Sequence, residues 1–300
     1  MTQHGYWRDL RSDNRRMVVR DGAVISNLWY LFPQGGGPRG AFTTFTDLKS
    51  HLKSRDMIIL SGVLREQVSC PVGVLDVTVV GAANKPRQAT SGGVPTGGGA
   101  SWLAPTSPVA LTPLISVIEQ GWAFENIQFA PVASSPCIWF RRQESATIPD
   151  ASHFRVSGCY FSAGGASGMG IAVGECSYGL IENNDFEGLG TGIGYKTDGG
   201  FAIGQYRHIV GNRFRRGTLN DIQIPGTNDL IENNVFQGLF ATEGGWRINL
   251  DGGSAGCQVI NNYVADVDTT IALGFKKSSA ADIWRNFVAT VVDPKVVVPA

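Results

Sequence analysis

The sequence contains 300 residues, of which 43% are hydrophobic, 17% are charged and 39 are glycine. This composition is too apolar for a disordered chain and too rich in turn-forming residues for a helical bundle, so it favours an all-β protein. Lysine and arginine together number 25, as do aspartate and glutamate, so the net charge favours neither nucleic acid nor an anionic membrane as a partner.

The five cysteines and four histidines indicate neither a disulfide framework nor a metal site. The cysteines are odd in number and lack CxxC spacing, and the histidines lie far apart in the sequence. We therefore expect buried free thiols, no bound metal and no cofactor.

Residues 1 to 40 differ in pattern from the rest of the chain. Residues 1 to 16 contain no apolar segment typical of a secretion signal, and no run in the sequence reaches the ~18 apolar residues of a membrane span. Six arginines and three aspartates give residues 1 to 40 a net charge of +3. We expect an attachment arm that becomes ordered on a partner; the alternative is an extra strand packed along the fold. The arginines of interest are Arg8, Arg11, Arg15, Arg16 and Arg20.

Two further segments precede the regular part of the chain or interrupt it. Residues 45 to 56 place Phe45, Leu48 and Leu52 on one helical face, with Thr46 as the expected N-cap. This pattern predicts a short amphipathic helix that covers the open end of a core. Residues 91 to 108 are rich in glycine and proline and predict a long loop.

From residue 124 onward a short motif recurs, most clearly as IENNDFEG from Ile181 and IENNVFQG from Ile231. The last apolar residues of its copies average 26.5 residues apart between 129 and 288, and they are Phe129, Phe161, Phe186, Phe214, Phe236, Val264 and Val288. Five positions before them stand Phe124, Val156, Ile181, Ile209, Ile231, Val259 and Ile283. Between them lie apolar-x-apolar triplets that begin at Ile115, Ile138, Ile171, Ile193, Ile222, Ile248 and Ile271.

Three short strands per coil of about 26 residues predict a right-handed parallel β-helix, in which each strand pairs with its copy one coil later. Two positions before the last apolar residue, five successive copies carry asparagine. We expect these asparagines to make the bend between two strands in the left-handed conformation and to hydrogen-bond along a ladder. They are Asn184, Asn212, Asn234, Asn262 and Asn286. The expected organisation is an arm at 1 to 40 and a β-helix at 41 to 300.

With these coils and this asparagine ladder, residues 45 to 298 resemble the pectate-lyase-like right-handed β-helix superfamily. That superfamily includes lyases, hydrolases, epimerases, phage tailspikes and virion proteins without activity. The basic arm and the missing secretion signal most resemble phage-encoded members carried on the particle. The resemblance implies synthesis in a host cytoplasm, location on the virion, and a homotrimer attached to capsid or tail proteins through the arm. An outward apolar column at Val235, Tyr263 and Phe287 agrees with self-association.

The resemblance also implies that a substrate would lie along the outside of the triplet strands. We expect an outward stripe there that includes four candidates for binding bacterial surface polysaccharide: Trp139, Arg141, Gln223 and Asn249. If the protein is an enzyme, the residue types for a lyase or hydrolase in this stripe are Asp221, Arg247, Asp251 and Lys196. Only a lyase would add Ca²⁺ as a cofactor.

We expect first a non-enzymatic structural or attachment protein of a bacteriophage particle, either a capsid decoration or a tail-associated protein. The first alternative is a depolymerase, a lyase or hydrolase that degrades an anionic bacterial polysaccharide. The second alternative is a glycan-binding module without turnover.

Overall fold

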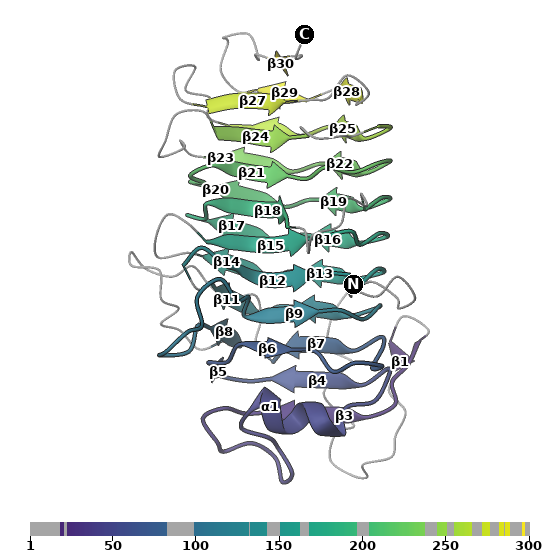
Figure 1. Ribbon diagram of the computed structural model, residues 1–300, viewed down its shortest axis with the longest axis vertical. Helices are drawn as coiled ribbons and strands as arrows, with labels where there is room; N and C mark the ends of the chain where they lie inside the picture. The colour runs from purple at the N-terminus through teal and green to yellow at the C-terminus, as the bar shows by residue number, and fades with distance from the viewer. Residues whose placement is uncertain are drawn as a thin grey trace.

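The computed structural model describes residues 19–20, 23–82, 99–131, 133–142, 151–162, 168–196, 204–237, 245–250, 255–265, 272–276, 282–284, 286–288 and 296–297. Apart from a small antiparallel pair, β1 (Val19–Arg20) with β2 (Ala23–Val24), its strands form three long parallel sheets. Within the coils each strand pairs with the strand three later in the chain, which is the winding of a right-handed parallel β-helix (Figure 1). The predicted fold class is confirmed.

The three sheets run side by side along the molecule. The first sheet contains β3 (Leu28–Leu31), β4 (Met57–Leu60), β7 (Thr78–Gly81), β10 (Ala123–Glu125), β13 (Arg155–Ser157), β16 (Leu180–Glu182), β19 (His208–Val210), β22 (Leu230–Glu232), β25 (Gln258–Ile260) and β28 (Asp282–Trp284). The second sheet contains β5 (Val63–Leu64), β8 (Ser101–Leu103), β11 (Gln128–Ala130), β14 (Tyr160–Ser162), β17 (Asp185–Glu187), β20 (Arg213–Arg215), β23 (Val235–Gln237), β26 (Tyr263–Val264) and β29 (Phe287–Val288). The third sheet contains β6 (Val68–Ser69), β9 (Ile115–Val117), β12 (Pro136–Phe140), β15 (Met169–Val173), β18 (Thr191–Tyr195), β21 (Asn220–Gln223), β24 (Gly245–Asn249), β27 (Ala272–Lys276) and β30 (Val296–Val297).

The core is a set of apolar columns, because residues at equivalent positions in successive coils lie one above another. The phenylalanines at the ends of the repeats stack with ring centroids 4.8 to 5.1 Å apart and nearly parallel planes. Their predicted alignment is confirmed by the strand register of the second sheet. Burial of these columns supplies the main stabilisation of the fold, since single coils have no core of their own.

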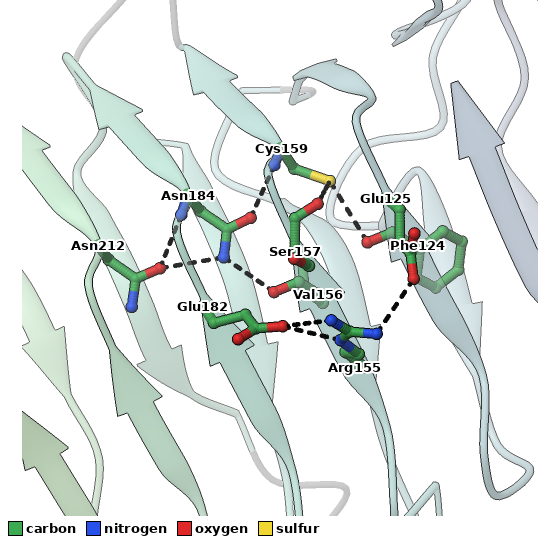
Figure 2. A network of polar contacts seen from close by, with 9 residues as sticks. All are labelled: Phe124, Glu125, Arg155, Val156, Ser157, Cys159, Glu182, Asn184 and Asn212. Carbon is green, nitrogen blue, oxygen red and sulfur yellow. Dashed lines mark hydrogen bonds and ion pairs between the residues drawn. The ribbon is translucent and has the colours of Figure 1, made fainter. Parts of the chain in front are cut away.

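The asparagine ladder lies at the bend between the first and second sheets. The Asn212 Oδ1 atom accepts hydrogen bonds from both Asn184 N and Asn184 Nδ2 at 3.0 Å. The Asn212 Nδ2 group donates to Ile181 O at 2.9 Å and to Asn234 Oδ1 at 3.0 Å. Figure 2 shows the start of this ladder, where Asn184 Oδ1 accepts from Cys159 N at 2.8 Å.

The expected backbone conformation of the ladder residues is wrong in detail. The left-handed residue is the one before the ladder asparagine, such as Asn183 with φ 54° or Asn233 with φ 55°. These preceding residues are exposed, whereas Asn184 and Asn234 are buried. Where two asparagines are adjacent, the first therefore makes the turn and the second occupies the ladder; before Asn212 the turn is made by Gly211, with φ 65°.

A helix covers the N-terminal end of the core, as predicted, but its start differs from the prediction. The helix α1 (Phe45–Leu48) continues into a 3₁₀ turn, η1 (Lys49–His51), and Phe45 and Leu48 are buried. Thr44, not Thr46, is the N-cap, because its Oγ1 accepts from Asp47 N at 3.1 Å.

Three expected boundaries differ from the structure. Residues Leu28–Leu31, expected within the arm, form β3 and pair in parallel with β4. Residues Ser101–Leu103, expected within the long loop, form β8 and pair with β11. The triplet of β27 is expected to begin at Ile271, opposite Ile248. In the structure Phe275 lies opposite Ile248 instead. Residues 91 to 98 and four of the arm arginines, Arg8, Arg11, Arg15 and Arg16, lie outside the described residues, while Arg20 belongs to β1.

Candidate functional site

The outward face of the third sheet carries one continuous column of aligned residues. Strand register places them opposite one another on successive coils: Ser116, Trp139, Ala172, Gly194, Gln223 and Asn249. Three of the four predicted glycan-binding residues therefore share one line along the molecule, on the strands β12, β21 and β24 (Figure 1). Two small residues, Ala172 and Gly194, separate the tryptophan from the amides; both are buried, and the Met169 side chain fills the space over Gly194.

Trp139 lies under two cations. The Arg141 guanidinium carbon is 4.7 Å and the Lys196 Nζ atom 4.4 Å from the indole centroid, distances at which a cation–π interaction stabilises the pair. The indole Nε1 donates to Lys196 O at 3.4 Å, and the side chain is only 7% exposed. Trp139 is thus not the open stacking platform that the sequence suggested; it holds Arg141 and Lys196, both half-buried, at the surface.

A loop at residues 104 to 113 borders this cationic cluster. Gln67 holds the loop: its Nε2 group donates to Val109 O at 3.0 Å and Thr112 O at 2.7 Å, and its Oε1 accepts from Val109 N. Lys196 Nζ reaches Leu111 O at 3.5 Å, although the two residues are 85 positions apart in the chain. The Leu111 side chain is 67% exposed beside the lysine. No local sequence pattern predicts this contact, because it joins a loop to a coil that is distant in the chain.

The expected outward placement of Asp221 and Arg247 is wrong. Asp221 and Arg247 are buried, and Arg247 Nη1 lies 2.8 Å from Asp221 Oδ2. Gly192 stands at the same register position one coil earlier, and a Cβ atom there would come within 2.8 Å of the Phe214 ring. This position therefore faces the core, and the two charges form a buried ion pair between coils.

The chemistry of this pair is that of a structural contact. Burial raises the pKa of Asp221 to about 6, and the neighbouring Arg247 only partly opposes the shift. The same two coils contain a second buried ion pair, between Arg207 and Asp229, with Arg207 Nη2 2.6 Å from Asp229 Oδ2. Asp251, the remaining acidic candidate, lies outside the described residues. Within the described coils, the acid and base proposed for an enzyme do not meet on the surface.

The first sheet carries an outward polar network. Arg155 lies between two carboxylates, with Nη2 2.6 Å from Glu182 Oε1 and Nη1 3.4 Å from Glu125 Oε1 (Figure 2). Two coils further on from Arg155, His208 Nε2 lies 2.9 Å from Glu232 Oε1. Carboxylates thus outnumber arginines in this network, with three glutamates to one arginine.

The described thiols are not suited to nucleophilic chemistry. All five cysteines are free and buried, and burial raises the pKa of Cys159 to about 12 and that of Cys257 to about 11. Among the described side chains, no three histidines, cysteines or carboxylates gather in a way that would hold a metal ion. No helix in the described part of the chain has the length and apolar character needed to cross a membrane.

Comparison with known proteins identifies the fold. No family model matches the chain, and no curated protein matches it in sequence. A mutant of the DFA-IIIase from Arthrobacter chlorophenolicus, in complex with DFA-III, is similar with a TM-score of 0.57 and 15% identity, over 86% of this chain and 67% of that chain. Pectate lyase Pel9A is similar with a TM-score of 0.51 and 13% identity, over 86% of this chain and 79% of that chain.

These likenesses define the class of protein. The chain has the pectate-lyase-like right-handed parallel β-helix fold, in agreement with its own strand order. One fold of this kind supports many activities, so function has to be argued from the surface of this chain.

Proposed function

We propose that the protein is a non-enzymatic attachment protein that binds an acidic polysaccharide along the outward face of the third sheet. One observation carries the proposal: Trp139 holds Arg141 and Lys196 together at the surface, and Gln223 and Asn249 follow in the same register column as Trp139. Two adjacent cations favour a chain with repeated carboxylates or sulfates, and aligned amides suit its hydroxyl groups.

The absence of turnover in this proposal is supported by the placement of the acidic and basic candidates. Asp221 and Arg247 neutralise each other in the interior, where a polymer has no access. Lys196 rests on Trp139 and donates to the main-chain oxygen of Leu111, so contacts within the protein hold its ammonium group in place.

Isothermal calorimetry with alginate and polygalacturonate tests the binding surface. We expect the double variant Arg141→Gln/Lys196→Gln to weaken binding at least about tenfold, because two charge-assisted contacts are lost. The matched control is Arg213→Gln, which removes an exposed cation on the second sheet and should leave the affinity unchanged. Equal affinity of the double variant and the wild type would refute the assignment of this face.

The setting of the protein belongs to the same proposal. We propose carriage on a bacteriophage particle, with residues 1 to 40 attached to capsid or tail proteins; this rests on the sequence resemblance. Self-association as a trimer is supported by Tyr263, which is 41% exposed and lies in register with Val235 on the neighbouring strand. Mass spectrometry of purified particles tests the carriage, and sedimentation velocity of wild type and Tyr263→Asp tests the trimer.

A further inference from the structure

A second surface feature lies at the corner where the chain turns from the third sheet into the first. Three coils place an aromatic side chain two residues before the outward start of the first-sheet strand: His153, Tyr178 and Tyr206. Their rings stack, with centroids 4.9 Å apart for the first pair and 5.4 Å for the second. Tyr178 is 53% and Tyr206 49% exposed, in a fold whose other stacked rings are mostly buried.

The backbone at these residues is held in an unfavourable conformation. The φ angles are 58° at His153 and 56° at both tyrosines, in the left-handed region that bulky residues avoid. Main-chain hydrogen bonds to the next coil fix this turn, for example Tyr178 N to Gln205 O at 3.0 Å and Tyr206 N to Thr227 O at 3.1 Å. Other coils fill the same position with residues that tolerate it: Asp76, Gly121, Asn228 and Gly256.

Strain of this kind points to a role beyond the fold, because glycine or asparagine would make the same turn with less cost. Stacking offsets part of the strain, yet it leaves about half of the surface of Tyr178 and of Tyr206 exposed. A tyrosine side chain has only two χ torsions, so an exposed tyrosine loses little conformational entropy when a ligand binds.

The groups beside the stack indicate the kind of ligand. Arg155, two residues after His153, is matched by Glu182 and Glu125, and His208, two residues after Tyr206, is matched by Glu232. Three carboxylates, one arginine and one histidine therefore border the aromatic stack. This excess of carboxylates disfavours an acidic polysaccharide, whereas carboxylates beside exposed tyrosines can hydrogen-bond an uncharged, hydroxyl-rich partner.

We propose that this corner is a second carbohydrate-binding surface, built by His153, Tyr178 and Tyr206, that takes an uncharged glycan. This surface shares no residue with the surface assigned to the acidic polysaccharide, so failure of one proposal does not affect the other.

Affinity electrophoresis of the full chain in native gels containing dextran, laminarin, galactomannan or hydroxyethylcellulose tests this surface. We expect at least one polymer to retard the wild type, and Tyr178→Asn/Tyr206→Asn to weaken that binding about tenfold, because two aromatic contacts are lost. Asparagine tolerates the left-handed conformation, so thermal unfolding should show a folded variant, and the single change Tyr206→Asn gives a milder test. Val72→Asn, which alters a 65% exposed apolar residue in an early coil, should bind like the wild type, as should Arg141→Gln/Lys196→Gln.

Three outcomes would overturn the proposal. The first is a wild type that passes all four gels without retardation, which would leave the stack with a purely structural role. The second is a folded double variant that is retarded as strongly as the wild type. The third is a sedimentation result in which the double variant splits an oligomer, which would make the stack a contact between copies of the chain.

Discussion

The buried asparagines show how one side chain can satisfy several groups in the interior of a β-helix. Asn212 accepts two hydrogen bonds and donates two, so neither its own polar atoms nor those of the neighbouring turns lack partners. Asn183, one turn away, is exposed and serves only the backbone conformation. Side chains of one residue type thus have different energetic weight within the same repeat.

We predict that Asn212→Ala lowers the free energy of unfolding by at least about 3 kcal/mol, since it leaves several buried donors and acceptors without partners. The control Asn183→Gly keeps the left-handed turn and should cost less than about 1 kcal/mol. Urea denaturation of both variants measures the difference. Similar losses for the two would mean that the ladder hydrogen bonds contribute no more than the turn.

Asp221 gives a prediction for pH dependence. Its pKa is near 3.8 in an unfolded chain and about 6 in the folded protein, so the folded state binds the proton more tightly between these values. Stability contributed by this group is present below pH 4 and is lost as the pH rises through 6. We therefore expect the unfolding free energy of the wild type, relative to Asp221→Asn, to fall between pH 4 and pH 7. A relative rise over that range would mean that attraction to Arg247 outweighs burial.

The N-terminal helix is the element whose start can be tested most simply. Thr44→Ala removes the acceptor of the Asp47 amide and should lower stability by about 1 kcal/mol. Thr46→Ala should cost clearly less, because the Thr46 hydroxyl makes only a 3.4 Å contact with Glu66. Thermal unfolding of the two variants distinguishes the caps, and a larger loss for Thr46→Ala would contradict the observed N-cap.

The strands and their alignment follow from the sequence because the columns repeat. Phe186 and Phe214 stack as their spacing indicates, and Asp185 and Glu187 lie opposite Arg213 and Arg215 as expected, with Arg215 3.0 Å from Glu187. Tyr178 and Tyr206 each stand three positions before a core isoleucine of the repeat. Extending the repeat alignment by three residues towards the N-terminus would therefore have predicted their stacking.

The site could be predicted only in part. Strict alternation along the strand would place Asp221 on the outside, because Ile222 points inward. Both side chains are buried, because two successive residues at the start of β21 face the core. The position of Lys196 over Trp139 depends on side chains that reach from one coil to another. The contact of Lys196 with Leu111 likewise joins parts of the chain that no local sequence pattern connects.

The whole molecule is a rod with two outward faces of different character. The third sheet presents Arg141 and Lys196 over Trp139, whereas the corner of the first sheet presents exposed tyrosines beside a network rich in carboxylates. A rod held by continuous columns keeps such groups at fixed spacing, which suits attachment to an extended polymer.

Size-exclusion chromatography with light scattering, on the protein mixed with alginate of defined chain length, tests binding and turnover together. We predict that protein and alginate elute together at low salt, that they separate as salt rises, and that the length of the recovered alginate is unchanged. Shortened alginate would show that the protein is an enzyme. Separate elution at low salt would contradict its attachment to acidic polysaccharide.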